Sequence, residues 1–167
     1  MTVTVREARP EEYAAIGDLI VAAYADFIEV AEDGGYVAEL RDVARRARDC
    51  PIYVAVDEDG TVVGAATYVP GPGNPFAEVE RDGEAGIRML AVSPDARRRG
   101  IGTLLTDAMV DRARADGCSG MALLSLPTMT AAHAMYERAG FVREPTRDWE
   151  YRPGAYLWAF ALRFDRA

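Results

Sequence analysis

The residue types best suited to chemistry gather in one segment, Arg97-Arg98-Arg99-Gly100-Ile101-Gly102-Thr103, where three arginines precede two glycines. A run from Ile87 to Val92 that is apolar apart from Arg88 comes before this segment, and apolar residues at helical spacing follow it. Backbone N–H groups at the start of a helix lack an intrahelical acceptor, and the helix dipole favours an anion there. Glycines let the backbone approach that anion without a Cβ in the way. A strand, a basic turn and a helix in this order predict a pyrophosphate-binding site.

Three kinds of phosphate-binding site and one structural alternative compete as interpretations of this turn. A Walker P-loop requires Gly-Lys-Ser/Thr, but here Thr103 follows Gly102 with no lysine between them. A dinucleotide fingerprint requires a third glycine, and Leu105 occupies that position. The remaining ligand is coenzyme A, and the structural alternative is a charged, solvated turn before an ordinary helix.

The pattern Arg97-x-x-Gly100-x-Gly102, preceded by Leu90-Ala91-Val92, resembles the acyl-CoA signature of the GNAT N-acetyltransferase superfamily. One strand and one helix later, Tyr136-Glu137-Arg138-Ala139-Gly140-Phe141 is similar to the family's tyrosine–glycine–phenylalanine motif. The two motifs stand in the order that the family has. The chain departs from the family at Met129, because an asparagine usually stands there, seven residues before the tyrosine. The polar contact of that asparagine with the cofactor is therefore not carried over.

The resemblance implies acetyl-CoA as the co-substrate, bound by one strand and the turn that follows it. The pantetheine arm would pair with the strand edge, and the turn would hold the pyrophosphate. A backbone N–H near Val92 would also polarise the acetyl carbonyl. The implied cofactor-binding residues are Leu90, Ala91, Val92, Arg97, Arg98, Arg99, Gly100, Ile101, Gly102 and Thr103.

The same resemblance implies that a neutral primary amine attacks the thioester directly in a ternary complex. Tyr136 matches the family's acid, which protonates the departing thiolate; the alternative is an aromatic side chain that only packs beneath the sheet. Glu84, at the start of the central strand, would relay a proton through water, unless it is a solvated carboxylate at the end of a loop. His133 is an alternative candidate for the base, but its place three residues before Tyr136 puts it on the cofactor's side of the helix or in solvent.

The acceptor site in this family is built from the first two helices, the far sheet edge and the last hairpin. Aromatic and acidic side chains in these regions suit an amine with an apolar body. They are Tyr24, Phe27, Tyr36, Trp149, Tyr151 and Tyr156, with Asp26, Glu29, Glu32 and Asp33. Arg147 and Arg152 would instead suit a substrate carboxylate. The expected partner is a small-molecule or peptide amine, and a small molecule is favoured over a protein N-terminus or lysine. A domain that binds acyl-CoA without turnover is the second function class, and Tyr136 argues against it.

Composition narrows the function classes further. The 167 residues carry 19 Lys plus Arg and 27 Asp plus Glu, a net charge of −8 that repels nucleic acid and attracts cationic amines. Two cysteines and one histidine are too few for a zinc site, so no metal is expected. No apolar run approaches the ~18 residues of a membrane span, and the N-terminus lacks signal-peptide features. A cytoplasmic protein without membrane contact is expected, and the apolar last strand leaves a homodimer open.

Periodicity and turn residues predict a single domain of the α/β class. The resemblance implies that this domain, residues 1–167, is a GNAT N-acetyltransferase domain. The expected order is strand, two helices, three strands, then helix, strand, helix and two strands. This order corresponds to the GNAT acyl-CoA N-acyltransferase fold, with a mixed, mainly antiparallel sheet of about seven strands flanked by about four helices. The long loop from Pro70 to Gly83 is either functional or a surface excursion.

Overall fold

The computed structural model describes residues 2–28 and 35–165. Their contacts group into two compact units, one of Met1–Tyr68 with Met89–Leu105 and one of Val69–Arg88 with Thr106–Ala167. Strand β4 (Glu84–Val92) and helix α4 (Ile101–Ala115) each have residues in both units. The two units are described separately below, and a single domain over the whole chain stays a prediction.

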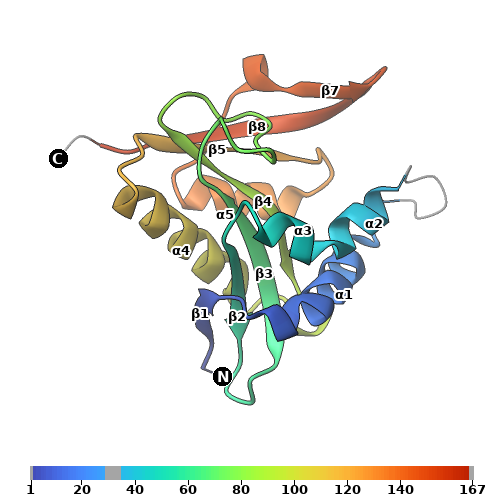
Figure 1. The fold of residues 1–167 in the computed structure, drawn as a ribbon. Helices are drawn as coiled ribbons and strands as arrows, with labels where there is room; N and C mark the ends of the chain where they lie inside the picture. Colours follow the sequence, from blue (N-terminus) through green and yellow to red (C-terminus); the bar gives the residue numbers. More distant parts are fainter. Residues whose placement is uncertain (1, 29–34, 166–167) are drawn as a thin grey trace. The chain divides into compact units, whose positions relative to one another are not determined.

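The first unit contains an antiparallel sheet of β1 (Thr4–Glu7), β2 (Ile52–Val56) and β3 (Val62–Val69). The residues Asp57-Glu58-Asp59-Gly60 predict a hairpin turn between β2 and β3. Gly60 in this turn is in the left-handed region, at φ 81°, as that prediction requires. The Ser93 N–H donates to the Val63 carbonyl at 2.8 Å, so the end of β4 continues this sheet beside β3 (Figure 1).

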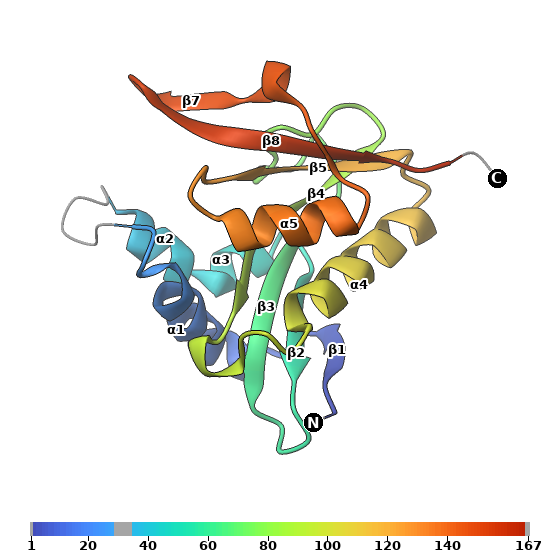
Figure 2. The same ribbon diagram turned by 180° about the vertical axis from the view of Figure 1, so that it is seen from behind.

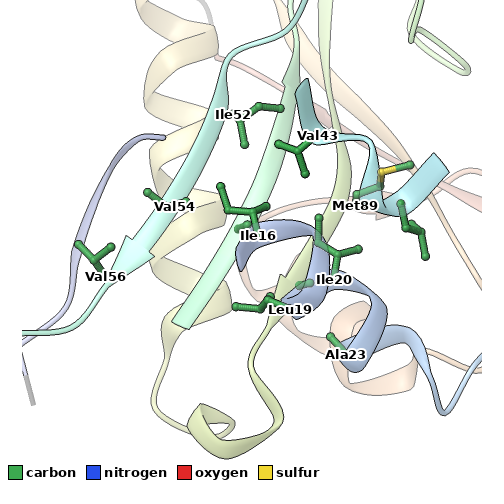
Figure 3. Close-up of a cluster of buried hydrophobic side chains, with 12 residues drawn as sticks. Ile16, Leu19, Ile20, Ala23, Val43, Ile52, Val54, Val56 and Met89 are labelled. Atoms are coloured by element: carbon green, nitrogen blue, oxygen red, sulfur yellow. The ribbon is translucent and has the colours of Figure 1, made fainter. Parts of the chain in front are cut away.

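Three helices of the first unit follow β1: α1 (Tyr13–Tyr24), α2 (Tyr36–Arg41) and α3 (Val43–Ala47). Apolar side chains of α1 pack against those of β2 and against Met89 of β4 (Figure 3). The sequence predicts one helix where α2 and α3 stand. The helix breaks at Asp42, whose ψ is 63° and whose carboxylate accepts the Arg45 N–H at 3.2 Å, so Asp42 caps a new helix.

The first turns of α4 pack against β2 and β3 in a separate cluster, which contains Ala55, Val63, Ile101 and Leu105. A Cβ on Gly64 would lie only 2.8 Å from the Ile101 side chain and 3.3 Å from the Ala91 carbonyl oxygen. Gly64 therefore lets the start of α4 approach the sheet closely. This contact fixes the helix start next to the end of β4.

The second unit contains the start of β4, which pairs in parallel with β5 (Gly120–Ser125). Strand β5 pairs antiparallel with β8 (Ala155–Arg163), which also pairs with β6 (Val142–Arg143) and β7 (Trp149–Arg152). The sequence predicts a single strand from roughly Phe141 to Tyr151. The structure has two strands there, because Pro145 begins a 3-10 turn between β6 and β7.

Helix α5 (Thr130–Arg138) lies along β5 and β8 (Figure 2). The rings of His133 and Tyr136 lie 4.9 and 6.2 Å from the ring of Phe160 on β8. Within the described residues, eight strands and five helices confirm the predicted α/β class and the mixed, mainly antiparallel sheet, with one strand and one helix more than expected. None of the helices in the described ranges combines the length and apolar character that a membrane span requires.

Candidate active site

The second half of β4 presents a backbone edge. The registered pairing of β4 with β5 ends at Gly86↔Ala122, whereas β5 pairs with β8 as far as Ser125. Three residues later, Met89 has φ 53°, a left-handed conformation that costs about 1–3 kcal/mol in a residue with a Cβ. Such a residue within a strand redirects the chain, as a β-bulge does. The local backbone therefore changes course just before Leu90.

Alternation along the strand decides which way the backbone groups of Leu90 and Val92 point. Because the Ser93 N–H bonds to β3, the N–H groups of Leu90 and Val92 point to the opposite edge. The Tyr24 hydroxyl, at the end of α1, donates to the Leu90 carbonyl at 3.3 Å. The backbone groups of the predicted pantetheine-binding segment thus face away from β3, and α1 holds the segment through the Leu90 carbonyl.

The basic turn that follows β4 has an unusual backbone. After the 3-10 turn Pro94–Ala96, Arg97 is extended, and both Arg98 (φ 66°) and Gly100 (φ 75°) are left-handed. Helix α4 begins at Ile101, and the Leu104 N–H closes its first turn on the Gly100 carbonyl at 3.0 Å. A Cβ on Gly100 would meet no atom of the described chain within 4 Å. The start of α4 therefore opens onto space that an anion can enter.

The three arginines of the turn differ in their surroundings. The Arg97 guanidinium lies 3.4 Å from the Ala23 carbonyl, at the C-terminal end of α1, and 3.8 Å from Asp26. It therefore fastens the turn to the negative end of the α1 dipole. Arg98 and Arg99 are exposed. Their charges can act on an anion at the helix start, whereas Arg97 acts mainly through the position of the turn.

Tyr136, the predicted acid, is almost completely buried on α5. Its ring lies 5.7 Å from that of Phe141, and no side chain within residues 2–28 and 35–165 hydrogen-bonds to its hydroxyl. Burial raises the pKa of the phenol above its usual value. The hydroxyl therefore keeps its proton through the neutral and mildly alkaline range, as a proton donor must.

Comparison with known proteins agrees with this arrangement. Residues 16–141 match the model of the acetyltransferase (GNAT) family. The chain belongs to this family. The L-methionine sulfoximine/L-methionine sulfone acetyltransferase of Pseudomonas paraeruginosa is 34% identical over 98 residues, which are 59% of this chain and 54% of that protein. The mycothiol acetyltransferase of Geodermatophilus obscurus is 32% identical over 120 residues, 70% of this chain and 38% of that protein. The match thus spans about half or less of each curated relative.

Solved structures confirm the GNAT fold. The histone acetyltransferase HPA2 and related acetyltransferase from Corynebacterium glutamicum is 24% identical, with a TM-score of 0.75 over 100% of this chain and 99% of that one. The PaiA N-acetyltransferase from Thermoplasma acidophilum, solved with coenzyme A, is 15% identical, with a TM-score of 0.75 over 98% of this chain and all of that one.

In this GNAT chain, the His133 side chain bonds and packs against residues of the second unit, to which it belongs. Its Nε2 lies 3.1 Å from the Ser125 hydroxyl and 3.0 Å from the Leu126 carbonyl, and its ring stacks on Trp158 at 5.6 Å. Burial lowers the pKa of the imidazole, so the ring is neutral at physiological pH. His133 joins α5 to the end of β5, which is a packing role.

Glu84, the predicted base, forms a two-fold ion pair with Arg147. Its carboxylate oxygens lie 2.6 and 3.2 Å from the guanidinium, and one also accepts the Arg81 N–H at 2.8 Å. Burial raises the pKa of the carboxyl, but the bonds to Arg147 and Arg81 outweigh it and hold the pKa below its ordinary value. An ion-paired carboxylate is a weak proton acceptor, and the catalytic role of Glu84 stays a prediction.

Arg147 is also unavailable as a reader of a substrate carboxylate. Besides Glu84, it donates to the Val79 carbonyl at 2.6 Å and lies 3.6 Å from Glu144, and its side chain is only 4% exposed. Arg152 instead lies over the Tyr151 ring at 5.7 Å. Of the two candidate carboxylate readers, Arg152 alone remains accessible.

The aromatic candidates for the acceptor site fall in both units. In the first unit, Tyr24 and Tyr36 are half-buried and Phe27 is exposed. On the β7–β8 hairpin of the second, Trp149, Tyr151 and Tyr156 are 49%, 41% and 44% exposed. Glu29, Glu32 and Asp33 lie outside the described residues. The hairpin is thus an accessible aromatic surface.

Sequence reasoning missed the side chains of the loop between β3 and β4. Glu78 lies 2.8 Å from Arg88 of β4, and the Glu80 carboxylate lies against Gly86 of the same strand. The loop is therefore packed on β4. The sequence offers little indication of this packing, because the two glutamates stand among prolines and glycines. Their spacing does not relate them to a strand several residues away.

The Glu84–Arg147 pair generates a stability prediction. We expect Glu84→Gln to lower the free energy of unfolding at pH 7 by roughly 3 kcal/mol, because the buried guanidinium loses its counter-ion. The folded-state pKa of Glu84 is depressed, so this contribution is present above about pH 4.5 and is lost as the pH falls through the lowered pKa.

Denaturant unfolding of both proteins at pH 7 and in acid measures this difference, with the exposed Glu58→Gln as the control variant. The gap between wild type and Glu84→Gln should narrow in acid. A gap that is absent at pH 7, or equally large in acid, would contradict the account of this pair.

Proposed function

We propose that this chain transfers an acetyl group from acetyl-CoA to a primary amine by direct attack in a ternary complex. The observation that carries the proposal is the backbone from Met89 to Thr103. There a strand with an outward-facing edge leads through two left-handed residues into a helix whose start is open at Gly100. Family membership supports the same activity.

The residues of the first unit fit the parts of acetyl-CoA. The strand edge at Leu90 and Val92 would pair with the amides of the pantetheine arm, as an added strand does. The N–H groups of the turn from Arg98 to Thr103 would hold the pyrophosphate at the positive end of the α4 dipole. The Arg98 and Arg99 charges add long-range attraction that salt screens.

The chemistry requires two proton transfers, one from the attacking amine and one to the departing thiolate. Tyr136 would supply the second, because its buried phenol keeps its proton at neutral pH. A backbone N–H near Val92 would polarise the acetyl carbonyl as negative charge develops on its oxygen. We therefore propose Tyr136 as the acid and the backbone N–H near Val92 as the oxyanion contact.

The acceptor we favour is a small-molecule amine. The two curated relatives are named for the acetylation of small molecules, methionine sulfoximine or sulfone and mycothiol. A net charge of −8 attracts an ammonium group, and the aromatic hairpin offers an apolar surface for its body. A peptide amine is the alternative acceptor.

Release of free thiol from acetyl-CoA tests the function. A panel should contain amino acids and their analogues, polyamines, aminoglycosides and peptides with a free N-terminus or lysine. We expect turnover with at least one small primary amine, and a rate that rises toward alkaline pH as the amine loses its proton. Hydroxyl and thiol compounds of matched size are the controls. Turnover of the hydroxyl and thiol controls alone would contradict the proposal, and so would the absence of turnover with every compound in the panel.

Tyr136→Phe tests the acid. The variant keeps the ring contacts with Phe141 and Phe160 but lacks the proton donor, so kcat should fall by about 10²- to 10⁴-fold. The acetyl-CoA affinity and thermal midpoint should change little. Tyr68→Phe, in a buried tyrosine of β3, is the matched control for loss of a hydroxyl. If Tyr136→Phe keeps wild-type kcat, the tyrosine is a packing residue only.

A further inference from the structure

Helix α1 ends beside the backbone groups of β4 that face away from β3. Tyr24, the last residue of the helix, donates its hydroxyl proton to the Leu90 carbonyl at 3.3 Å. Its side chain is half-buried and packs against the apolar cluster that contains Ala23 and Met89 (Figure 3). These residues all belong to the first unit. The Tyr24 side chain is therefore held at both ends, by the cluster and by the Leu90 carbonyl.

The order of the binding groups along the chain gives the proposed cofactor a direction. The groups that would hold the pyrophosphate, from Arg98 to Thr103, follow the end of β4. A pantetheine arm that leaves them would run back along the strand, so it reaches Val92 before Leu90. The acyl group stands at the far end of this arm, and the proposed oxyanion contact is near Val92. An acyl chain that extends beyond this contact would therefore run toward Leu90.

The stretch from Val92 to Leu90 is short. Two residues of an extended strand span about 6.6 Å. The Tyr24 oxygen lies in front of the Leu90 carbonyl and so occupies one end of this stretch. A carbon atom in van der Waals contact on both sides requires about 7 Å. The space beyond the acyl carbonyl therefore suits one methyl group, and a further methylene would press against the Tyr24 side chain.

The Tyr24 side chain cannot move aside without loss of contacts. Its hydroxyl would leave the Leu90 carbonyl, and its ring would leave the apolar cluster. The end of α1 is also fixed, because the Arg97 guanidinium lies 3.4 Å from the Ala23 carbonyl and 3.8 Å from Asp26. This end of the proposed cofactor segment is therefore closed by a side chain with little freedom to move.

We propose that Tyr24 limits the acyl group that this chain transfers to acetyl. The inference rests on the proposed transfer from acetyl-CoA, and it names the residue that selects the acyl donor. Tyr24 takes no part in the changes of bonding. It contacts the methyl group of the bound acetyl-CoA and closes the space beside Leu90. A shorter side chain at this position would open that space to propionyl and butyryl groups.

The affinities for acyl-CoAs of increasing length test this role without an amine. Calorimetric titration measures the dissociation constants of acetyl-, propionyl- and butyryl-CoA. We expect the wild type to bind butyryl-CoA about 10-fold or more weakly than acetyl-CoA, because a methylene that does not fit is discriminated by about 10- to 200-fold. Tyr24→Leu keeps an apolar side chain on the cluster but is shorter, so these two affinities should differ by less than about 3-fold.

Two further variants separate the acyl limit from a general loosening of α1. Tyr24→Phe removes only the hydroxyl and keeps the ring on the cluster, so its discrimination against butyryl-CoA should lie between those of the wild type and Tyr24→Leu. Tyr13→Leu shortens a half-buried tyrosine that packs against the same cluster from the first residue of the same helix. This control should keep the wild-type ratio of affinities. Thermal midpoints show that each variant is folded.

Three results would overturn the role of Tyr24. The first is equal affinity of the wild type for acetyl- and butyryl-CoA. The second is a folded Tyr24→Leu that keeps the wild-type ratio of affinities. The third is a Tyr13→Leu that loses this ratio to the same extent as Tyr24→Leu.

Thiol release with the amine panel separates this inference from the proposed function. Turnover of acetyl-CoA by the wild type, with an unchanged ratio of affinities in Tyr24→Leu, overturns the role of Tyr24 and leaves acetyl transfer in place. The expected ratios without turnover of any amine overturn acetyl transfer and support Tyr24 as the limit of an acyl-CoA-binding site. A wild type that binds no acyl-CoA overturns both.

Discussion

Strand β4 changes course after the part that is registered against β5, Glu84 to Gly86, and the proposed site depends on this change of course. A strand hydrogen-bonded along both edges has no backbone groups left for a ligand. Here the registered pairs stop at Gly86, and Met89 adopts a left-handed conformation. That conformation costs about 1–3 kcal/mol, which the buried contacts of the Met89 side chain with α1 help to offset. The outward edge at Leu90 and Val92 follows from it.

The end of α1 holds both parts of the proposed cofactor site. Tyr24 donates to the Leu90 carbonyl, and the Arg97 guanidinium lies against the Ala23 carbonyl. Gly64 brings the start of α4 down onto β3 beside the same strand. The packing of the first unit therefore fixes the edge of β4, the arginine turn and the start of α4 before any ligand binds. This reduces the conformational entropy that is lost on binding.

Local chemistry made much of this predictable from the sequence. The turn from Arg97 to Thr103, the hairpin at Gly60 and the helix before Gly140 follow from residue type and spacing alone. Asp42 and Pro145 also carried local signals, an N-cap and a strand break, which the periodicity of their neighbours masked. Contacts distant in sequence were not predictable. The Arg147–Glu84 pair joins residues 63 positions apart, and the fit of Glu80 against Gly86 depends on the path of a loop.

The central claim is that acetyl-CoA binds along the outer edge of β4 and the turn that follows it. Amide hydrogen exchange measured by NMR, with and without saturating acetyl-CoA, tests this claim most directly. We expect the exchange of the Leu90 and Val92 amides and of amides from Arg98 to Thr103 to slow on binding, while amides of the β2–β3 turn keep their rates. Binding of acetyl-CoA that leaves the exchange of both segments unchanged would contradict the account.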